Sequence, residues 1–341
     1  MHVFLADLFS TLDHQNDSTL YLIDYAQRNL KHRLESDYCW ARPLAYSVST
    51  LNQYNGIYID GYIKNGQLVE QIEFIPFTSV SAVHWRADPP VDLSQLRTWI
   101  AYSGHSLGQN VRYLNTFESL LTFNEKLLPV VLHREFGADF IPTIVTQDLR
   151  VLAQFFEQFG RSGVVIKPFA SAASRDIFFA TNDTLDTPAF LERCNMILER
   201  NGAYLIAQPY DDNILQQGEV RVFVIGGNVV GALHKQAPNQ NPILNFDAHI
   251  EREKPKLSLV PLSQEIRLRV EPLARYLMTA GVYLATVDFV GSKLLEVNIT
   301  SPGLMKSHDV LAGKPILAKA YWAFDEPSGT GDGKLSGPIS L

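Results

Sequence analysis

Asp288, Glu296 and Asn298 place two carboxylates and an amide close together near the C-terminal end of the chain. Residues 291–293 can form a three-residue loop between two strands, which would set Asp288 directly opposite Glu296. Like charges that face each other across a strand pair destabilise it. A cation between them would remove that penalty, and such oxygen donors suit Mg²⁺, which completes its shell with water and substrate phosphates.

The residues after this loop alternate in polarity, as a strand with one buried face requires. One face would carry Leu295, Val297 and Ile299, and the other Glu296, Asn298 and Thr300. An alternative is a hairpin whose polar face meets only solvent, and this stretch by itself leaves both interpretations open.

Lys167 ends an apolar run, residues 163–167, that predicts a buried strand. A lysine at the end of such a strand is unfavourable unless it meets an anion or water, so we expect Lys167 to face a phosphate. Small residues follow at 170–174, before a further strand expected at 177–180. They predict a lid whose hydroxyls and backbone amides could cap that phosphate.

Lys126 gives a weaker signal. It follows Asn124 and Glu125 in a segment that we expect to be helical from Thr116 to about Phe136. Its spacing in that segment predicts an exposed lysine, so spacing alone gives Lys126 no function.

Arg86 and Asp88 stand after a strand expected at residues 83–85 and before two prolines that stop it. Strand ends are where α/β domains bind ligands, so both side chains are candidate substrate contacts. The alternative is a structural Arg-Asp pair that fixes the loop.

Two further segments carry polar groups at the ends of strands. The backbone of residues 208–210 could offer a donor and an acceptor to a purine edge, or could simply form a turn. Glu219 and Arg221 share one face of a second predicted hairpin, and Lys235 follows it.

The bulk composition predicts a folded, acidic protein. The chain has 341 residues, 46% of them hydrophobic, and a net charge of −7 without blocks of lysine and arginine. That is enough chain for two or three domains and a poor basis for general nucleic-acid binding. Cys39 and Cys194 lack metal-type and disulfide-type spacing. No signal peptide or membrane-length apolar run is recognisable, so we expect a cytoplasmic protein.

Strand and helix signals alternate along the chain and predict the α/β (α+β) class. A hairpin is expected over residues 57–77, where Asn65-Gly66 supplies the positive φ angles of a tight turn. Helices are expected at residues 17–30, 93–107, 149–159, 188–201, 263–280 and 315–324.

Six motifs resemble those of bacterial glutathione synthetase, a family of ATP-grasp ligases. They are Arg86-Ala-Asp-Pro-Pro90, Asn124-Glu-Lys-Leu127, Ile166-Lys-Pro-Phe169, Ala207-Gln-Pro-Tyr210, Gly218-Glu-Val-Arg221, and the stretch from Val287-Asp288 through Glu296-Val-Asn-Ile-Thr-Ser-Pro302. Their order and approximate gaps match the family up to Pro302. The resemblance implies an ATP-grasp fold preceded by an α/β pre-ATP-grasp domain.

The resemblance also implies a division of the chain. We expect an N-terminal substrate domain at residues 1–120, a lid subdomain at 121–200 and a C-terminal ATP-grasp subdomain at 201–325. Residues 326–341 are rich in Gly, Ser and Pro without apolar periodicity, which predicts a disordered tail.

The family phosphorylates a substrate carboxylate with ATP, and an amine then attacks the acyl phosphate to give an amide. The resemblance therefore implies a role for each candidate residue. Nucleotide contacts would be Lys126, Lys167, Gln208, Pro209, Tyr210 and Glu219, and Mg²⁺ ligands would be Asp288, Glu296 and Asn298. Substrate contacts would be Arg86, Asp88 and Ser301, and Arg221 and Lys235 would act at the reaction centre.

Two stretches depart from the family pattern. The family's lid is glycine-rich, whereas residues 170–175 read Ala-Ser-Ala-Ala-Ser-Arg, and side chains limit how closely backbone approaches a phosphate. The family also carries two arginines after the second hairpin. Residues 234–250 offer only Lys235 in their place, without the bidentate fork of a guanidinium.

We therefore expect an ATP-dependent carboxylate-amine ligase with γ-glutamylcysteine, glycine and ATP as substrates. Alternatives are a ligase for a different peptide or amine, an enzyme that phosphorylates an acceptor without ligation, and a non-catalytic nucleotide-binding protein on the same fold. Expected partners are ATP and small peptide or amino-acid substrates, without nucleic acid or membrane. The resemblance also implies a possible homo-oligomer.

Overall fold

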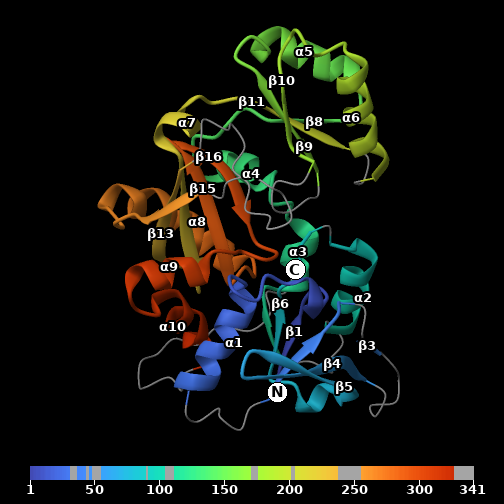
Figure 1. Ribbon diagram of the computed structural model, residues 1–341, viewed down its shortest axis with the longest axis vertical. Helices are drawn as coiled ribbons and strands as arrows, with labels where there is room; N and C mark the ends of the chain where they lie inside the picture. Colours follow the sequence, from blue (N-terminus) through green and yellow to red (C-terminus); the bar gives the residue numbers. More distant parts are fainter. Residues whose placement is uncertain are drawn as a thin grey trace.

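The computed structural model describes residues 1–30, 37–43, 46–47, 55–89, 91–103, 111–169, 176–200, 204–236 and 255–325. Three β-sheets with flanking helices follow one another along the chain, which confirms the predicted α/β class (Figure 1). In the view of Figure 1 the four-stranded sheet lies at the top, the five-stranded sheet in the middle and the seven-stranded sheet at the bottom.

The first sheet has the strand order β3-β4-β2-β1-β6-β7, with β5 paired to β4. Its strands are β1 (His2–Leu5), β2 (Tyr38–Ala41), β3 (Tyr46–Ser47), β4 (Gly56–Lys64), β5 (Gln67–Pro76), β6 (Ala82–Trp85) and β7 (Arg112–Leu114). Strand β1 pairs in parallel with β2 and β6 and is buried along its length, as is typical of a central parallel strand. Helices α1 (Ser18–Asn29) and α2 (Leu93–Ser103) belong to this part of the chain, and the side chain of Asp17 caps α1.

The second sheet, in the order β10-β9-β11-β8, is antiparallel. Its elements are β8 (Ile144–Thr146), α5 (Leu149–Phe159), β9 (Val164–Pro168), β10 (Phe178–Ala180), α6 (Pro188–Arg200) and β11 (Leu205–Pro209). Apolar residues at helical spacing on α5, including Leu152 and Phe156, are buried in one core with Phe190 of α6.

The third sheet has the order β14-β13-β12-β15-β16 and is also antiparallel. Its strands are β12 (Glu219–Ile225), β13 (Asn228–Gln236), β14 (Lys256–Leu259), β15 (Leu284–Val290) and β16 (Lys293–Asn298). The helices in this half of the fold are α4 (Leu128–Phe136), α7 (Asn213–Gln217), α8 (Gln264–Thr279), α9 (Met305–Ala312) and α10 (Ile316–Trp322). Every residue of β15 is buried, so polar groups on it need partners within the protein.

Asn115, which lies between β7 and α3 (Phe117–Thr122), joins the first sheet to the third. Its Nδ2 donates to the carbonyls of Leu284 and Ile299, and its Oδ1 accepts from the amides of Tyr283 and Leu284. Both donors and both acceptor positions of this buried amide are therefore satisfied. The start of β15 is thereby fixed against the N-terminal part of the chain.

Helix α10 packs back onto the first sheet through buried polar contacts. The hydroxyl of Tyr321 lies 2.7 Å from Nδ1 of His84, and Nε2 of His84 lies 3.2 Å from Nδ1 of His2. Trp322 donates from Nε1 to the carbonyl of Leu22 at 2.9 Å. The two ends of the described chain therefore share one core.

Most of the predicted elements are confirmed. Asn65 and Gly66 have φ angles of 51° and 75° and form the turn between β4 and β5. Ser263 caps α8 by accepting a hydrogen bond from the Ile266 amide. Helix α9 was not predicted, because the stretch that follows Pro302 carries no clear capping signal.

The predicted helix running to about Phe136 is wrong, because α3 ends at Thr122 and α4 begins at Leu128. Asn124 interrupts it. Its Oδ1 accepts from the Lys126 amide at 3.0 Å and its Nδ2 donates to the carbonyl of Phe169 at 3.2 Å. These bonds offer the backbone an alternative to a helical turn.

Several predictions lie outside the described residues. They concern the lid at 170–174, the part of the stretch 234–250 that lies beyond Gln236, and the tail at 326–341. Within the part of the chain that the structure describes, no helix is long and apolar enough to cross a membrane.

Buried His84 predicts a loss of stability in mild acid. Burial holds its pKa well below the usual 6.5, so below that pH the unfolded chain binds a proton that the folded chain excludes. This residue should then lower the free energy of unfolding by about 1.4 kcal/mol per pH unit. Urea denaturation at a series of pH values measures the slope. His84→Gln should flatten it, and the exposed His14→Gln should not. Equal slopes in both variants would contradict this account.

Candidate functional site

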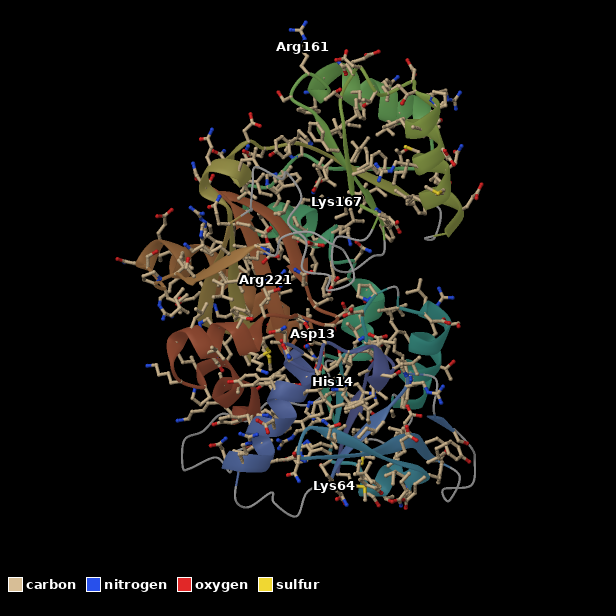
Figure 2. The ribbon with its side chains drawn as sticks, in the orientation of Figure 1. Asp13, His14, Lys64, Arg161, Lys167 and Arg221 are labelled. Atoms are coloured by element: carbon tan, nitrogen blue, oxygen red, sulfur yellow. The ribbon has the colours of Figure 1, made fainter. Side chains whose placement is uncertain are left out.

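A cavity of about 330 Å³ opens between the N-terminal part of the chain and the third sheet. Predicted residues that line it are Arg86, Asp88, Lys126, Glu219, Arg221, Lys235, Asp288, Glu296, Asn298 and Ser301. In Figure 2, Lys167, Arg221 and Asp13 follow one another from the upper part of the molecule to its centre. The structure therefore brings candidates that are far apart in sequence to one place.

Asp288 is the most heavily contacted carboxylate in this cavity. Arg221 donates to it from Nε at 2.8 Å and from Nη2 at 2.6 Å, and Nζ of Lys235 lies 3.3 Å from Oδ2. Burial alone would raise the pKa of Asp288, but Arg221 and Lys235 outweigh burial and hold this pKa below its usual value. Lys235 also forms an ion pair with Glu219, which lies opposite it on β12.

The predicted alignment of Asp288 with Glu296 is confirmed, but the predicted three-residue loop is wrong. Val290 pairs with Lys293, so the turn has two residues, and a bulge next to Asp288 restores the alignment. As a result of the bulge, half-buried Leu295 lines a pocket. The prediction that it shares the buried face of Val297 and Ile299 is therefore wrong.

The repulsion between Asp288 and Glu296 does not by itself require a metal ion. Arg221 and Lys235 neutralise Asp288, and Nζ of Lys126 lies 3.7 Å from Glu296. Nδ2 of Asn298 lies 3.3 Å from Oδ2 of Asp288. A flip of the side-chain amide exchanges Nδ2 and Oδ1, so the same side chain can turn an oxygen toward this position. Among the described residues no three His, Cys, Asp or Glu side chains gather as a metal site, so a metal here would have two carboxylates and an amide.

Lys126 and Lys167 are both buried. Lys126 is 5% exposed, so the exposed position predicted from helical spacing is wrong, because Asn124 breaks the helix and the chain turns inward. Lys167 lies on β9 and is 8% exposed. Burial lowers the pKa of Lys167, and the nearby charge of Glu296 opposes this effect.

Glu125 is a buried residue that the sequence analysis did not single out. One of its oxygens, Oε1, accepts hydrogen bonds from the amides of Ile299 and Thr300 and from the hydroxyl of Thr300, at 2.6 to 2.9 Å. Burial raises the pKa of this carboxyl group. Glu125 fixes the chain just after Asn298, and its place in the Asn124-Glu-Lys motif was the signal available for it.

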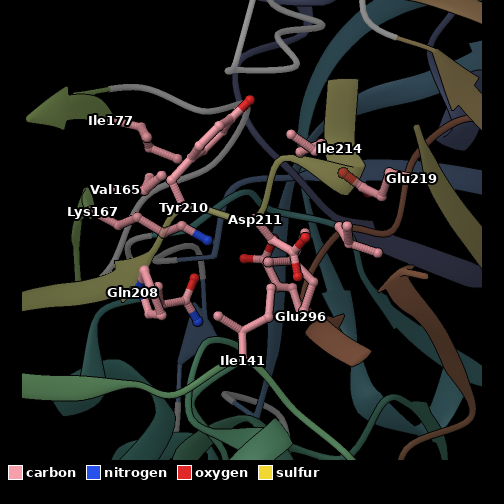
Figure 3. Close-up of a pocket in the computed structure, with 13 residues that line it drawn as sticks. Ile141, Val165, Lys167, Ile177, Gln208, Tyr210, Asp211, Ile214, Glu219 and Glu296 are labelled. Atoms are coloured by element: carbon pink, nitrogen blue, oxygen red, sulfur yellow. The ribbon is translucent and has the colours of Figure 1, made fainter. Parts of the chain in front are cut away.

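A second, smaller pocket of about 100 Å³ adjoins the cavity and shares Ile177, Glu219 and Glu296 with it. Its lining combines apolar side chains with a few polar ones: Ile141, Val165, Lys167, Ile177, Gln208, Pro209, Tyr210, Asp211, Ile214, Glu219, Val290, Leu295 and Glu296 (Figure 3). Such a lining is typical of a site for a small organic ligand.

The backbone of residues 208–210 offers less to a purine than the sequence suggested. Pro209 has no amide hydrogen, and the amide of Tyr210 donates to the carbonyl of Gly163 at 2.9 Å. The side chain of Gln208 has a spare acceptor instead. Its Nε2 donates to Thr143 at 2.9 Å, and its buried Oε1 has no hydrogen-bond partner among the described residues.

Arg86 also lines the cavity and lies just after β6, where it was predicted. Its Nε donates to Oγ1 of Thr19 and its Nη2 donates to the carbonyl of Pro302, each at 3.0 Å. Asp88 is exposed, and Asp88 and half-buried Ser301 also line the cavity. Asp13, Asn16 and Asp17 line the same cavity, although the sequence analysis gave them no role in a site.

Comparison with known proteins assigns the chain to a family. The family model of the prokaryotic glutathione synthetase ATP-grasp domain matches residues 125–312. Among curated relatives, the glutathione synthetase of Neisseria meningitidis serogroup A is 27% identical over 88% of this chain and 90% of its own length. The glutathione synthetase of Ralstonia nicotianae is 28% identical over 76% of each chain.

Solved structures show the same fold at lower sequence identity. The D-cycloserine synthetase DcsG is 17% identical with a TM-score of 0.55, and the macrocyclase MdnC of Microcystis aeruginosa is 15% identical with a TM-score of 0.58. Each similarity covers 94% of this chain and 98% of the other. Because the family model spans more than half of the chain, the protein belongs to the prokaryotic glutathione synthetase family and is an ATP-grasp ligase.

Proposed function

We propose that the protein uses ATP to join the carboxylate of γ-glutamylcysteine to the amine of glycine through an acyl phosphate. The observation that carries the proposal is the junction of the two pockets. There, buried Lys126 and Lys167, the pair Asp288 and Glu296, and Arg221 lie around connected space. Phosphoryl transfer depends on positioning and on neutralising charge, and this junction offers both.

We assign the smaller pocket to the adenine and ribose. Its apolar side chains, among them Ile141, Val165 and Leu295, suit the faces of a purine. The unpartnered Oε1 of Gln208 would accept a hydrogen bond from the adenine amino group, and Glu219 would reach the ribose. In Figure 3 the side chain of Lys167 extends into the region between Gln208 and Glu219, where the phosphates would begin.

We assign Mg²⁺ to Asp288, Glu296 and Asn298. The donor set fits, because two neighbouring carboxylates and an amide leave the remaining coordination positions to water and nucleotide phosphates. When bound, the ion would neutralise phosphate charge and hold the transferring phosphoryl group in line. Arg221 and Lys235, which contact Asp288, would stabilise negative charge at the reacting carboxylate.

The substrates occupy the larger cavity in this proposal. Arg86, Asp88 and Ser301 would contact the acid substrate. A second candidate is a ligase for a different amine or peptide. The replacement of the family's arginines by the single charge of Lys235, which is already paired with Glu219, favours it. A further alternative is that the protein binds nucleotide but is catalytically inactive. The turnover experiment distinguishes this alternative from a ligase.

The setting of the reaction is also part of the proposal. Cys39 and Cys194 are both free and buried, which suits the reducing cytoplasm. A homo-oligomer and the division at residues 120, 200 and 325 stay predictions.

Turnover tests the proposed substrates. Release of phosphate should require Mg²⁺, ATP, γ-glutamylcysteine and glycine together, and mass spectrometry should detect the tripeptide. Replacing glycine by other amino acids and amines tests the second candidate. ADP together with a phosphorylated acid and no amide would indicate a kinase, and no ADP with any acid and amine would contradict a ligase function.

Nucleotide binding tests the assigned metal ligands separately from turnover. A ligand that binds only the folded state at about 100 times its Kd stabilises that state by about 2.7 kcal/mol. Mg²⁺ with a non-hydrolysable ATP analogue should therefore raise the melting temperature, and Glu296→Gln should lose most of the Mg²⁺-dependent part of the rise. Glu157→Gln, an exposed change on α5, is the matched control. A full Mg²⁺-dependent rise in Glu296→Gln would refute the assignment.

A further inference from the structure

Three carboxylates of the described residues lie on the face of the third sheet that lines the large cavity. They belong to Glu219 on β12, Asp288 on β15 and Glu296 on β16, and these strands are neighbours in the sheet. Glu219 and Asp288 are buried, so water does not compensate their charges. Each of these two carboxylates therefore needs a cation beside it.

One ammonium group contacts both of the buried carboxylates. Nζ of Lys235 forms an ion pair with Oε1 of Glu219 and lies 3.3 Å from Oδ2 of Asp288. Lys235 belongs to β13, so its side chain reaches across β12 to a carboxylate on β15. Neighbouring strands are about 4.8 Å apart, and only a long side chain reaches over two such spacings. Lys235 is 2% exposed, so its two partners and the surrounding protein hold the ammonium group in place.

A divalent ion that bridged Glu219 and Asp288 would need the place of this ammonium group. Mg²⁺ binds carboxylate oxygens at about 2.0–2.1 Å, so a bridging ion would lie against the same oxygens that Lys235 contacts. The side of Asp288 toward β16 is different, because Glu296 lies opposite it there and Asn298 follows on the same face. That side is where a divalent ion finds oxygen donors.

The fixed charges of this face balance before a nucleotide binds. The three carboxylates are matched by three cations that contact them, namely Lys126, Arg221 and Lys235. The nucleotide phosphates then bring further negative charge, and a divalent ion bound to them enters with them. Some sites of phosphoryl transfer hold two metal ions about 3.5–4 Å apart to neutralise such charge.

We propose that the ammonium group of Lys235 takes the place of a second divalent ion, so that the site binds one metal ion, between Asp288 and Glu296, with each nucleotide. The inference rests on the proposed function and adds to it the number of metal ions and a second role for Glu219, which holds the ammonium group. A compact ammonium group suits this position because it is a point charge with three donors. Unlike a metal ion, it stays in the site when the products leave.

Electron paramagnetic resonance with Mn²⁺ counts the metal ions. The full chain, in excess over a non-hydrolysable ATP analogue so that the nucleotide is protein-bound, is titrated with Mn²⁺. Two Mn²⁺ ions about 3.5–4 Å apart, the spacing of a two-metal site, are magnetically coupled and give a spectrum unlike that of a single ion. We expect the wild-type protein to show a single bound ion, even with Mn²⁺ in excess.

Removal of the ammonium group should open the second position. In Lys235→Met, Glu219 and Asp288 lose the cation between them, so a second Mn²⁺ should enter and give the coupled spectrum. Without nucleotide, Mg²⁺ should raise the melting temperature of Lys235→Met more than that of the wild-type protein. The double variant Lys235→Met/Glu219→Gln removes one charge of each sign and should return to a single ion. Lys314→Met, an exposed change before α10, is the matched control.

Two results would overturn the proposal. One is a coupled pair of Mn²⁺ ions in the wild-type protein, and the other is a single ion in folded Lys235→Met. Lys235→Gln, whose amide keeps a hydrogen bond to a carboxylate, replaces Lys235→Met with the same expectation if that variant does not fold. Either result leaves the proposed function intact, because Mn²⁺ and nucleotide are bound in both. The absence of protein-bound Mn²⁺ with the analogue present would instead count against the proposed function.

Discussion

A buried carboxylate held by two cations is the interaction on which the rest of the site depends. Asp288 lies on a fully buried strand, so its charge must be compensated where it stands. Arg221 donates one hydrogen bond to each of its two oxygens, and Lys235 approaches Oδ2, which fixes the direction of the carboxylate. The strand register then sets the other charges, because Glu219 lies opposite Lys235 and Glu296 lies opposite Asp288.

The segment that follows β16 shows how the N-terminal part of the chain takes part in the site. Glu125 binds the amides of Ile299 and Thr300, Asn115 binds the carbonyl of Ile299, and Arg86 binds the carbonyl of Pro302. All three side chains are buried, so each of these bonds is expensive to leave unmade. They hold the chain next to Asn298 in one position, which gives the cavity a fixed wall between its phosphate end and its N-terminal end.

Local signals in the sequence predicted those features that depend on neighbouring residues. Alternating polarity and turn residues predicted the hairpins, and the helix expected at residues 17–30 is α1. The resemblance predicted the family and a role for Lys126, whereas spacing alone predicted an exposed lysine, because no pattern revealed that Asn124 breaks the helix. The bond from Arg86 to Pro302 joins residues 216 positions apart, and contacts of that kind have no local signature. The sequence did not reveal the bulge beside Asp288 either, because a three-residue loop without a bulge gives the same alignment of Asp288 with Glu296.

The central claim is that Asp288 and Glu296 hold a divalent ion together with nucleotide phosphates. Crystals grown with Mn²⁺ and a non-hydrolysable ATP analogue test it most directly, because anomalous scattering locates the manganese ion. The account predicts one anomalous peak at coordination distance from both carboxylates, with the phosphates beside Lys126 and Lys167. Manganese bound elsewhere, or nucleotide phosphates away from both lysines, would contradict it.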